Sequence, residues 1–71
     1  MAKMTFAEKL WDLRIEHHYT QTELAKEIGV AVSTYSAWER GISEPSLFNL
    51  ICLADIFKIG LDELVGREVK S

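Results

Sequence analysis

Apolar residues recur at helical spacing along most of this chain, and each such segment is bounded by residues that typically begin or end helices. Phe6, Leu10 and Leu13 stand at positions i, i+4 and i+7, the spacing of one buried helical face. The letters TFAE from Thr5 onward form a capping box, in which a Thr and a Glu three residues later bond each other's backbone amides. The pattern predicts a first helix that begins at Thr5 and ends near Glu16.

A second capping box follows a short break in the apolar pattern. His18 stands where a residue of left-handed conformation is expected to end the first helix. Thr20 and Glu23 then repeat the Thr-x-x-Glu signal, and Gly29 has the backbone freedom that a sharp turn requires. These signals predict a short second helix over residues 21–28.

The third predicted helix covers about residues 32–40. Tyr35 and Trp38 lie three positions apart and are expected to share its inner face, where aromatic residues at this spacing usually pack in a core. Gly41 is the expected residue after the helix. Ala31 stands at the N-cap, a position where Ser or Thr would bond a free amide.

Two further helices complete an all-α pattern. Pro45 and Ser46 open the fourth, and a short fifth helix over residues 61–65 lies between Gly60 and Gly66. No window alternates apolar and polar residues as a strand would. The residues expected on the buried face of the fourth helix are Leu47, Leu50, Ile51, Leu53, Ala54 and Phe57.

The segment QTELAKEIGVAVSTYSAWER, residues 21–40, contains the most informative pair of helices. Ala25 is small enough for another helix to approach closely, and Gly29 permits a tight turn. Two short helices joined by a three- or four-residue turn that contains Gly form a helix-turn-helix. In that unit the second helix lies in the major groove of DNA.

Five collinear pieces of the chain resemble one family. FAEKLWDLR, YTQTELAKEIGV, STYSAWERG, EPSLFNL and LADIFKIGLDEL are similar, in order and spacing, to the phage repressor and Cro-like (XRE-type) helix-turn-helix family. The resemblance spans about residues 6–65. It implies a compact, five-helix, lambda-repressor-like DNA-binding domain over residues 5–66, with the helix-turn-helix at the second and third helices. Residues 1–4 would be an N-terminal extension and residues 67–71 a C-terminal tail.

The resemblance also assigns roles to individual residues. Gln21 would contact a phosphate and support the third helix, while Thr34 and Arg40 would contact phosphates. Arg14 and Glu39 would form a partly buried ion pair between the first and third helices. The positions that would face the bases are Val32, Ser33, Ser36 and Ala37.

The charge balance bears on how tightly such a domain would hold DNA. Eight basic against eleven acidic residues give a formal charge of −3 and a pI of about 5.2, which argues against wrapping nucleic acid through bulk positive charge. None of the four base-facing residues is an Arg, Lys, Asn or Gln, the types that make paired contacts to base edges. We therefore expect modest affinity from one domain and a homodimer on double-stranded DNA, with half-sites about 34 Å apart.

Other features limit the remaining classes of function. At 71 residues with one cysteine, the chain can form one small domain without a disulfide framework. It has no apolar run long enough for a membrane span. Because the core must hold without disulfides, we expect a protein of the reducing cytoplasm. His17 and His18 lack the spacing of a metal site, and Cys52 lacks basic neighbours that would activate its thiol. We expect no metal, no cofactor and no enzymatic activity.

Two apolar stripes leave a second interpretation open. Trp11 and Ile15 on the first helix, and Phe48, Cys52 and Ile56 on the fourth, stand where the family usually has polar residues. Either the end of the chain, through Val65 and Val69, and long side chains cover them, or a stripe is a dimer or partner surface. The principal hypothesis is a sequence-specific transcription regulator, expected to be a repressor. The alternative is a protein-interaction module, antitoxin-like or co-regulatory, on the same fold.

Overall fold

Both predicted capping boxes form in the computed structural model, which describes residues 5–65. The hydroxyl of Thr5 accepts a hydrogen bond from the amide of Glu8 at 3.2 Å, and the Glu8 carboxylate accepts one from the amide of Thr5 at 2.9 Å. Thr20 and Glu23 make the same reciprocal pair at 3.0 and 2.9 Å. Because each box satisfies amides that a helix leaves free at its start, the first two helices begin where the sequence predicts.

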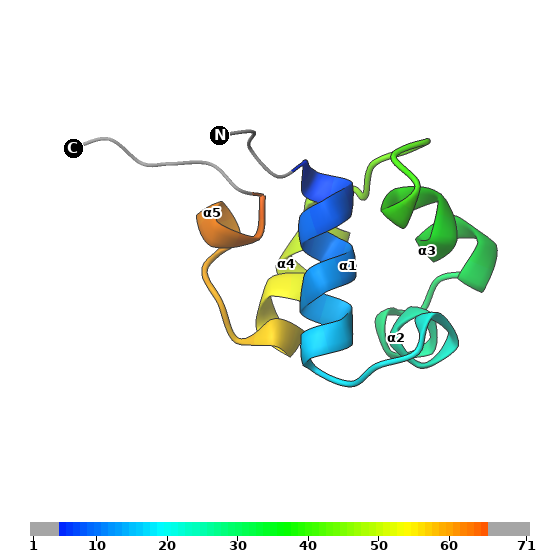
Figure 1. Cartoon of the computed structure of the whole chain (residues 1–71), viewed down its shortest axis with the longest axis horizontal. Helices are drawn as coiled ribbons and strands as arrows, with labels where there is room; N and C mark the ends of the chain where they lie inside the picture. Colours follow the sequence, from blue (N-terminus) through cyan, green and yellow to red (C-terminus); the bar gives the residue numbers. More distant parts are fainter. Residues whose placement is uncertain (1–4, 66–71) are drawn as a thin grey trace.

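Five helices and no strand occupy the described range, which confirms the all-α prediction (Figure 1). None of these helices has the length and apolar character needed to cross a membrane. Their bounds are α1 Phe6–Glu16, α2 Gln21–Ile28, α3 Val32–Glu39, α4 Leu47–Phe57 and α5 Leu61–Leu64.

The ends of the helices depend on backbone conformations of positive φ. Gly29 after α2 has φ +91° and Gly41 after α3 has φ +74°. His18 adopts φ +63° after α1, as its position predicted, and Lys58 ends α4 with φ +58°, which the sequence did not indicate. Left-handed conformations cost non-glycine residues energy, and at Lys58 the bond from the amide of Ile59 to the carbonyl of Ala54, at 3.0 Å, closes the end of the helix in this conformation.

The predicted bounds of two helices were one residue too long. α3 ends at Glu39, with Arg40 as its C-cap, and α5 ends at Leu64, with Val65 as its C-cap. Gly66, the expected end of the domain, lies outside the described residues. So do the N-terminal extension, residues 1–4, and the tail, residues 67–71.

The core forms where all five helices meet. Each helix contributes at least one side chain that is fully buried. These side chains are Leu10, Leu24, Tyr35, Leu53, Phe57 and Leu64. α2 packs against α3 and α4, α1 packs against α3 and α5, and α4 packs against α5. In Figure 1, α1 crosses the middle of the molecule, with α2 and α3 on one side and α5 on the other. The helix-turn-helix pair is therefore supported from behind by the core.

Two residues expected on the buried face of α4 are exposed instead. Leu47 is 63% exposed and Ile51 45% exposed, whereas Leu53, Ala54 and Phe57 are buried as predicted. The segment LFNLICLADIF is apolar on nearly every side, so its pattern cannot distinguish the packed face from its edge. Ile51 falls at that edge, and Leu47 is the first residue of the helix.

Candidate nucleic-acid interface

Helix α3 has one buried side and one side that faces out of the molecule. Tyr35 is fully buried and Trp38 is 3% exposed, with their rings edge to face at a centroid distance of 5.6 Å. The residues on the rest of the helix surface are Val32, Ser33 and Thr34, which are exposed, and Ser36 and Ala37, which are half-buried. The aromatic pair fixes how α3 is rotated about its axis, so these residues are presented outward.

The carboxylate of Glu39 fixes the position of α3 relative to α1 and α2. It forms an ion pair with Arg14, whose Nε donates to Oε2 at 2.6 Å and whose Nη2 donates to Oε1 at 3.2 Å. The Nε2 of Gln21 donates to the same Oε1 at 2.9 Å, and the hydroxyl of Tyr35 donates to Oε2 at 2.6 Å. Three side chains from three helices thus converge on one carboxylate.

The side chains of this ion pair are largely withdrawn from water, with 11% of Arg14 and 4% of Glu39 exposed. Burial by itself would raise the pKa of the Glu39 carboxyl, but the hydrogen bonds from Arg14, Tyr35 and Gln21 outweigh it and hold that pKa below its usual 4.5. Burial, and then the bond to Glu39, raises the pKa of the Tyr35 hydroxyl. Glu39 is therefore charged and Tyr35 neutral at pH 7, as the bonding requires.

Arg14 also holds the segment that leads into α2. Its Nη1 donates to the carbonyl oxygen of Tyr19 at 3.0 Å. Gln21 stands at the first position of α2, and its amide nitrogen is directed at Glu39. The structure therefore brings together Arg14, Gln21 and Glu39. The hydroxyl of Tyr35 was missed in the sequence, although its position four residues before Glu39, one helical turn, could have indicated it.

The turn between α2 and α3 is short and internally bonded. The amides of Gly29 and Val30 both donate to the carbonyl of Ala25, at 2.9 and 3.0 Å. Ala25 is 2% exposed, so its small side chain lies inside the packed helix pair. The first amides of α3 have no side-chain acceptor at the N-cap, because the residue there is Ala31.

Few basic residues lie in or next to the helix-turn-helix whose α3 side chains face outward. Lys26 in the last turn of α2 and Arg40 at the end of α3 are both exposed. Arg14 is already committed to Glu39. An anionic partner would therefore meet little positive charge here.

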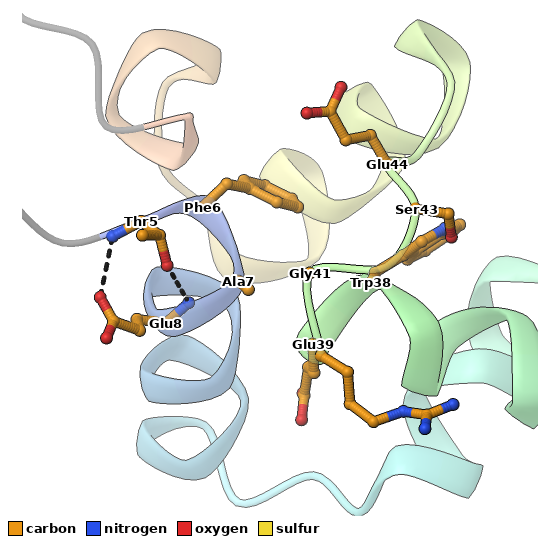
Figure 2. Close-up of a pocket in the computed structure, with 10 residues that line it drawn as sticks. Thr5, Phe6, Ala7, Glu8, Trp38, Glu39, Gly41, Ser43 and Glu44 are labelled. Carbon is orange, nitrogen blue, oxygen red and sulfur yellow. Dashed lines mark hydrogen bonds between the residues drawn. The ribbon is translucent and has the colours of Figure 1, made fainter.

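A cavity of about 500 Å³ opens between the start of α1 and the end of α3. Figure 2 shows Phe6, Trp38 and Gly41 around it, with the side chain of Glu8 bonded back to the backbone of Thr5. Of the three carboxylates that line the cavity, that of Glu8 is bonded within its capping box and that of Glu39 within its ion pair. Within the described range, no group of His, Cys, Asp and Glu side chains is arranged to hold a metal ion.

The two apolar stripes differ in exposure. Trp11 and Ile15 on α1 are 49% and 46% exposed, and Phe48 on α4 is 71% exposed. Cys52 is half-buried, and Ile56 packs against the core. The exposed surface of α4 therefore lies at its beginning, where Leu47 and Ile51 adjoin Phe48. Val69, one of the residues expected to cover a stripe, lies outside the described residues.

The fold and the arrangement of α2 and α3 define a helix-turn-helix protein of the lambda-repressor type. The profile of the helix-turn-helix family matches residues 12–64. The chain belongs to this family, in its phage repressor and Cro-like (XRE-type) branch.

Individual relatives agree with this assignment. The chain is 38% identical over 64 residues to the cryptic phage CTXphi transcriptional repressor RstR of Vibrio cholerae serotype O1, covering 90% of this chain and 57% of RstR. A transcriptional regulator from Listeria innocua superposes with a TM-score of 0.88 at 31% identity, over 99% of this chain and 65% of that one. The P22 c2 repressor in complex with a synthetic operator superposes with a TM-score of 0.83 at 28% identity, over 92% and 98%. The chain thus spans little more than half the length of RstR.

Proposed function

We propose that this protein is a sequence-specific, double-stranded DNA-binding transcription regulator that acts as a repressor by inserting α3 into the major groove. The observation that carries the proposal is the outward presentation of Val32, Ser33 and Ser36 on a helix that Glu39 fixes to both α1 and α2. A helix held in this way offers a major groove a defined set of side chains. The likeness to RstR and to the operator-bound P22 c2 repressor supports the same function. Such a regulator would act in the cytoplasm.

Phosphate contacts would set the register of the protein on DNA without reading its sequence. Thr34 is exposed on α3, Arg40 is exposed at the C-cap of that helix, and Gln21 begins α2. Substituting Arg40 with Ala should weaken binding to all duplexes about equally and reduce the slope of log K against log salt by about 0.9. Lys58→Gly is the matched control, because it removes the same charge at the end of α4. An unchanged slope in Arg40→Ala would contradict this placement.

A homodimer would supply the affinity that one weakly charged domain lacks. The exposed side chains of Leu47, Phe48 and Ile51 form an apolar surface at the beginning of α4, and such surfaces often mark association sites. We propose that a second copy covers this surface when two half-sites lie about 34 Å apart on one face of DNA. Phe48→Glu should abolish cooperative binding to a two-half-site duplex while preserving weak binding to a single half-site. Equal loss on both duplexes would contradict the dimer.

Selection from a random duplex pool tests the function itself. We expect enrichment of a twofold-symmetric site, with an affinity that falls steeply as salt rises. The alternative is a protein-interaction module on the same fold, which the exposed apolar side chains of α1 and α4 favour. Failure to enrich any site, together with a stable complex with a partner protein that Phe48→Glu disrupts, would establish that alternative.

A further inference from the structure

The outward surface of α3 offers a base pair apolar groups and single hydroxyls only. Successive helical residues are about 100° apart, so Val32, Ser33, Ser36 and Ala37 share one side roughly 140° wide. Tyr35 and Trp38 point the opposite way into the core. Val32 is 44% exposed, which leaves its methyl groups free at the start of the helix.

The chemistry of this surface excludes the contacts that most strongly distinguish bases. Arg and Lys read guanine and Asn and Gln read adenine through paired hydrogen bonds, and none of these residues occupies the four positions. The hydroxyl of each serine can donate to one base edge or accept from another, so its contact does not distinguish a donor from an acceptor on the base. Hydrogen bonds alone would therefore distinguish the four base pairs poorly.

Thymine presents the one apolar group in the major groove, its C5-methyl. Resting on the proposed function, we infer that α3 reads thymine through methyl contacts, with Val32 covering one thymine methyl and Ala37 another. The short side chains let the backbone of α3 lie close to the base edges, so that these methyls can touch. Ser33 and Ser36, between them in the same arc, reach the neighbouring base edges and hold the helix in register.

Replacing thymine with uracil removes only the methyl group and so isolates this contact. A duplex is first selected from a random pool, and each thymine on both strands is then replaced in turn. We expect one or two positions per half-site where uracil weakens binding roughly fourfold, and roughly fifteenfold when both half-sites carry the change. Elsewhere in the duplex, uracil should change the affinity less than twofold.

The protein side of the contact is tested with two variants of exposed apolar residues. Val32→Ala should bind more weakly, and the ratio of affinities for thymine and uracil at one sensitive position should fall to about one. Ile42→Ala is the matched control, because Ile42 is 67% exposed and follows α3 outside the four positions. Ile42→Ala should keep the wild-type ratio of affinities for the thymine and uracil duplexes. The fold of both is checked by circular dichroism.

The outcomes separate this inference from the function on which it rests. If no duplex is enriched from the pool, the proposed DNA-binding function is wrong. If a duplex is enriched but tolerates uracil at every position, or if Val32→Ala leaves the ratio unchanged, the protein binds DNA without reading thymine methyls and the inference is overturned.

Discussion

Removing the carboxylate of Glu39 is the most direct test of how α3 is held. In Glu39→Ala, Arg14 loses its partner for two hydrogen bonds, and Gln21 and Tyr35 each lose an acceptor. The side chain of Arg14 is 11% exposed, so water can replace the lost carboxylate only in part. The variant therefore leaves Arg14 with the Tyr19 carbonyl as its one remaining acceptor, and leaves Gln21 and Tyr35 without the acceptor they share.

The expected loss is a large share of the stability of so small a domain. Breaking one partner of a buried ion pair costs about 3–5 kcal/mol, and the access that Arg14 retains to water places this case at about 3–4 kcal/mol. A chain of 71 residues has a free energy of unfolding of roughly 4–11 kcal/mol. Glu39→Ala should therefore be partly unfolded at room temperature if the wild type lies near the lower value.

Urea unfolding followed by circular dichroism at pH 7 measures this loss. Glu27→Ala is the matched control, because its exposed carboxylate accepts a single bond from the Tyr19 hydroxyl at 2.8 Å, and it should unfold close to the wild type. A double-mutant cycle with Arg14→Met should give a coupling of about 1–3 kcal/mol. If the free energy of unfolding of Glu39→Ala lies less than about 1 kcal/mol below that of the wild type, the carboxylate does not fix α3.

Three further predictions concern the same helices. Because the pKa of Glu39 is lowered in the folded state, the stability that its carboxylate contributes is complete above pH 4.5 and is lost as the pH falls below that value. Between pH 7 and pH 3, the free energy of unfolding in urea should therefore fall less for Glu39→Gln than for the wild type, and equal falls would contradict the lowered pKa. Ala31→Ser should raise the free energy of unfolding by about 0.5–2 kcal/mol by capping α3, which thermal melting measures; an unchanged melting temperature would contradict the missing cap. Lys58→Gly should gain about 1 kcal/mol by relieving its positive φ, and a lower melting temperature than that of the wild type would disprove the strain.

Much of the fold was predictable because its signals are local. The two capping boxes lie within four residues each, and the glycines at 29 and 41 act on their own backbone. These features specify where a helix begins or ends regardless of what packs against it. The positive φ of Lys58 had no such signal, since lysine is not a residue type that favours this conformation.

The exposed surface of α4, in contrast, could not be predicted from a local signal. Its sequence is apolar on nearly every side, so the pattern named Leu47 and Ile51 as core residues together with Leu53 and Phe57. Only the positions of the neighbouring helices decide which of these sides is covered. The structure left Leu47 and Ile51 uncovered beside Phe48, and this surface is where we propose that a second copy binds.

The sequence by itself determined the number of helices, their order and which side of α3 faces outward, because helical spacing and capping act within a few residues of the chain. The family resemblance implied the pair of Arg14 and Glu39, but only the tertiary structure decided that Gln21 and Tyr35 bond the same carboxylate. Arg14 and Glu39 stand 25 positions apart in the chain, and no local pattern fixes the distance between two such side chains. Packing of five helices around a shared core does so, and it thereby sets the geometry with which α3 would meet DNA.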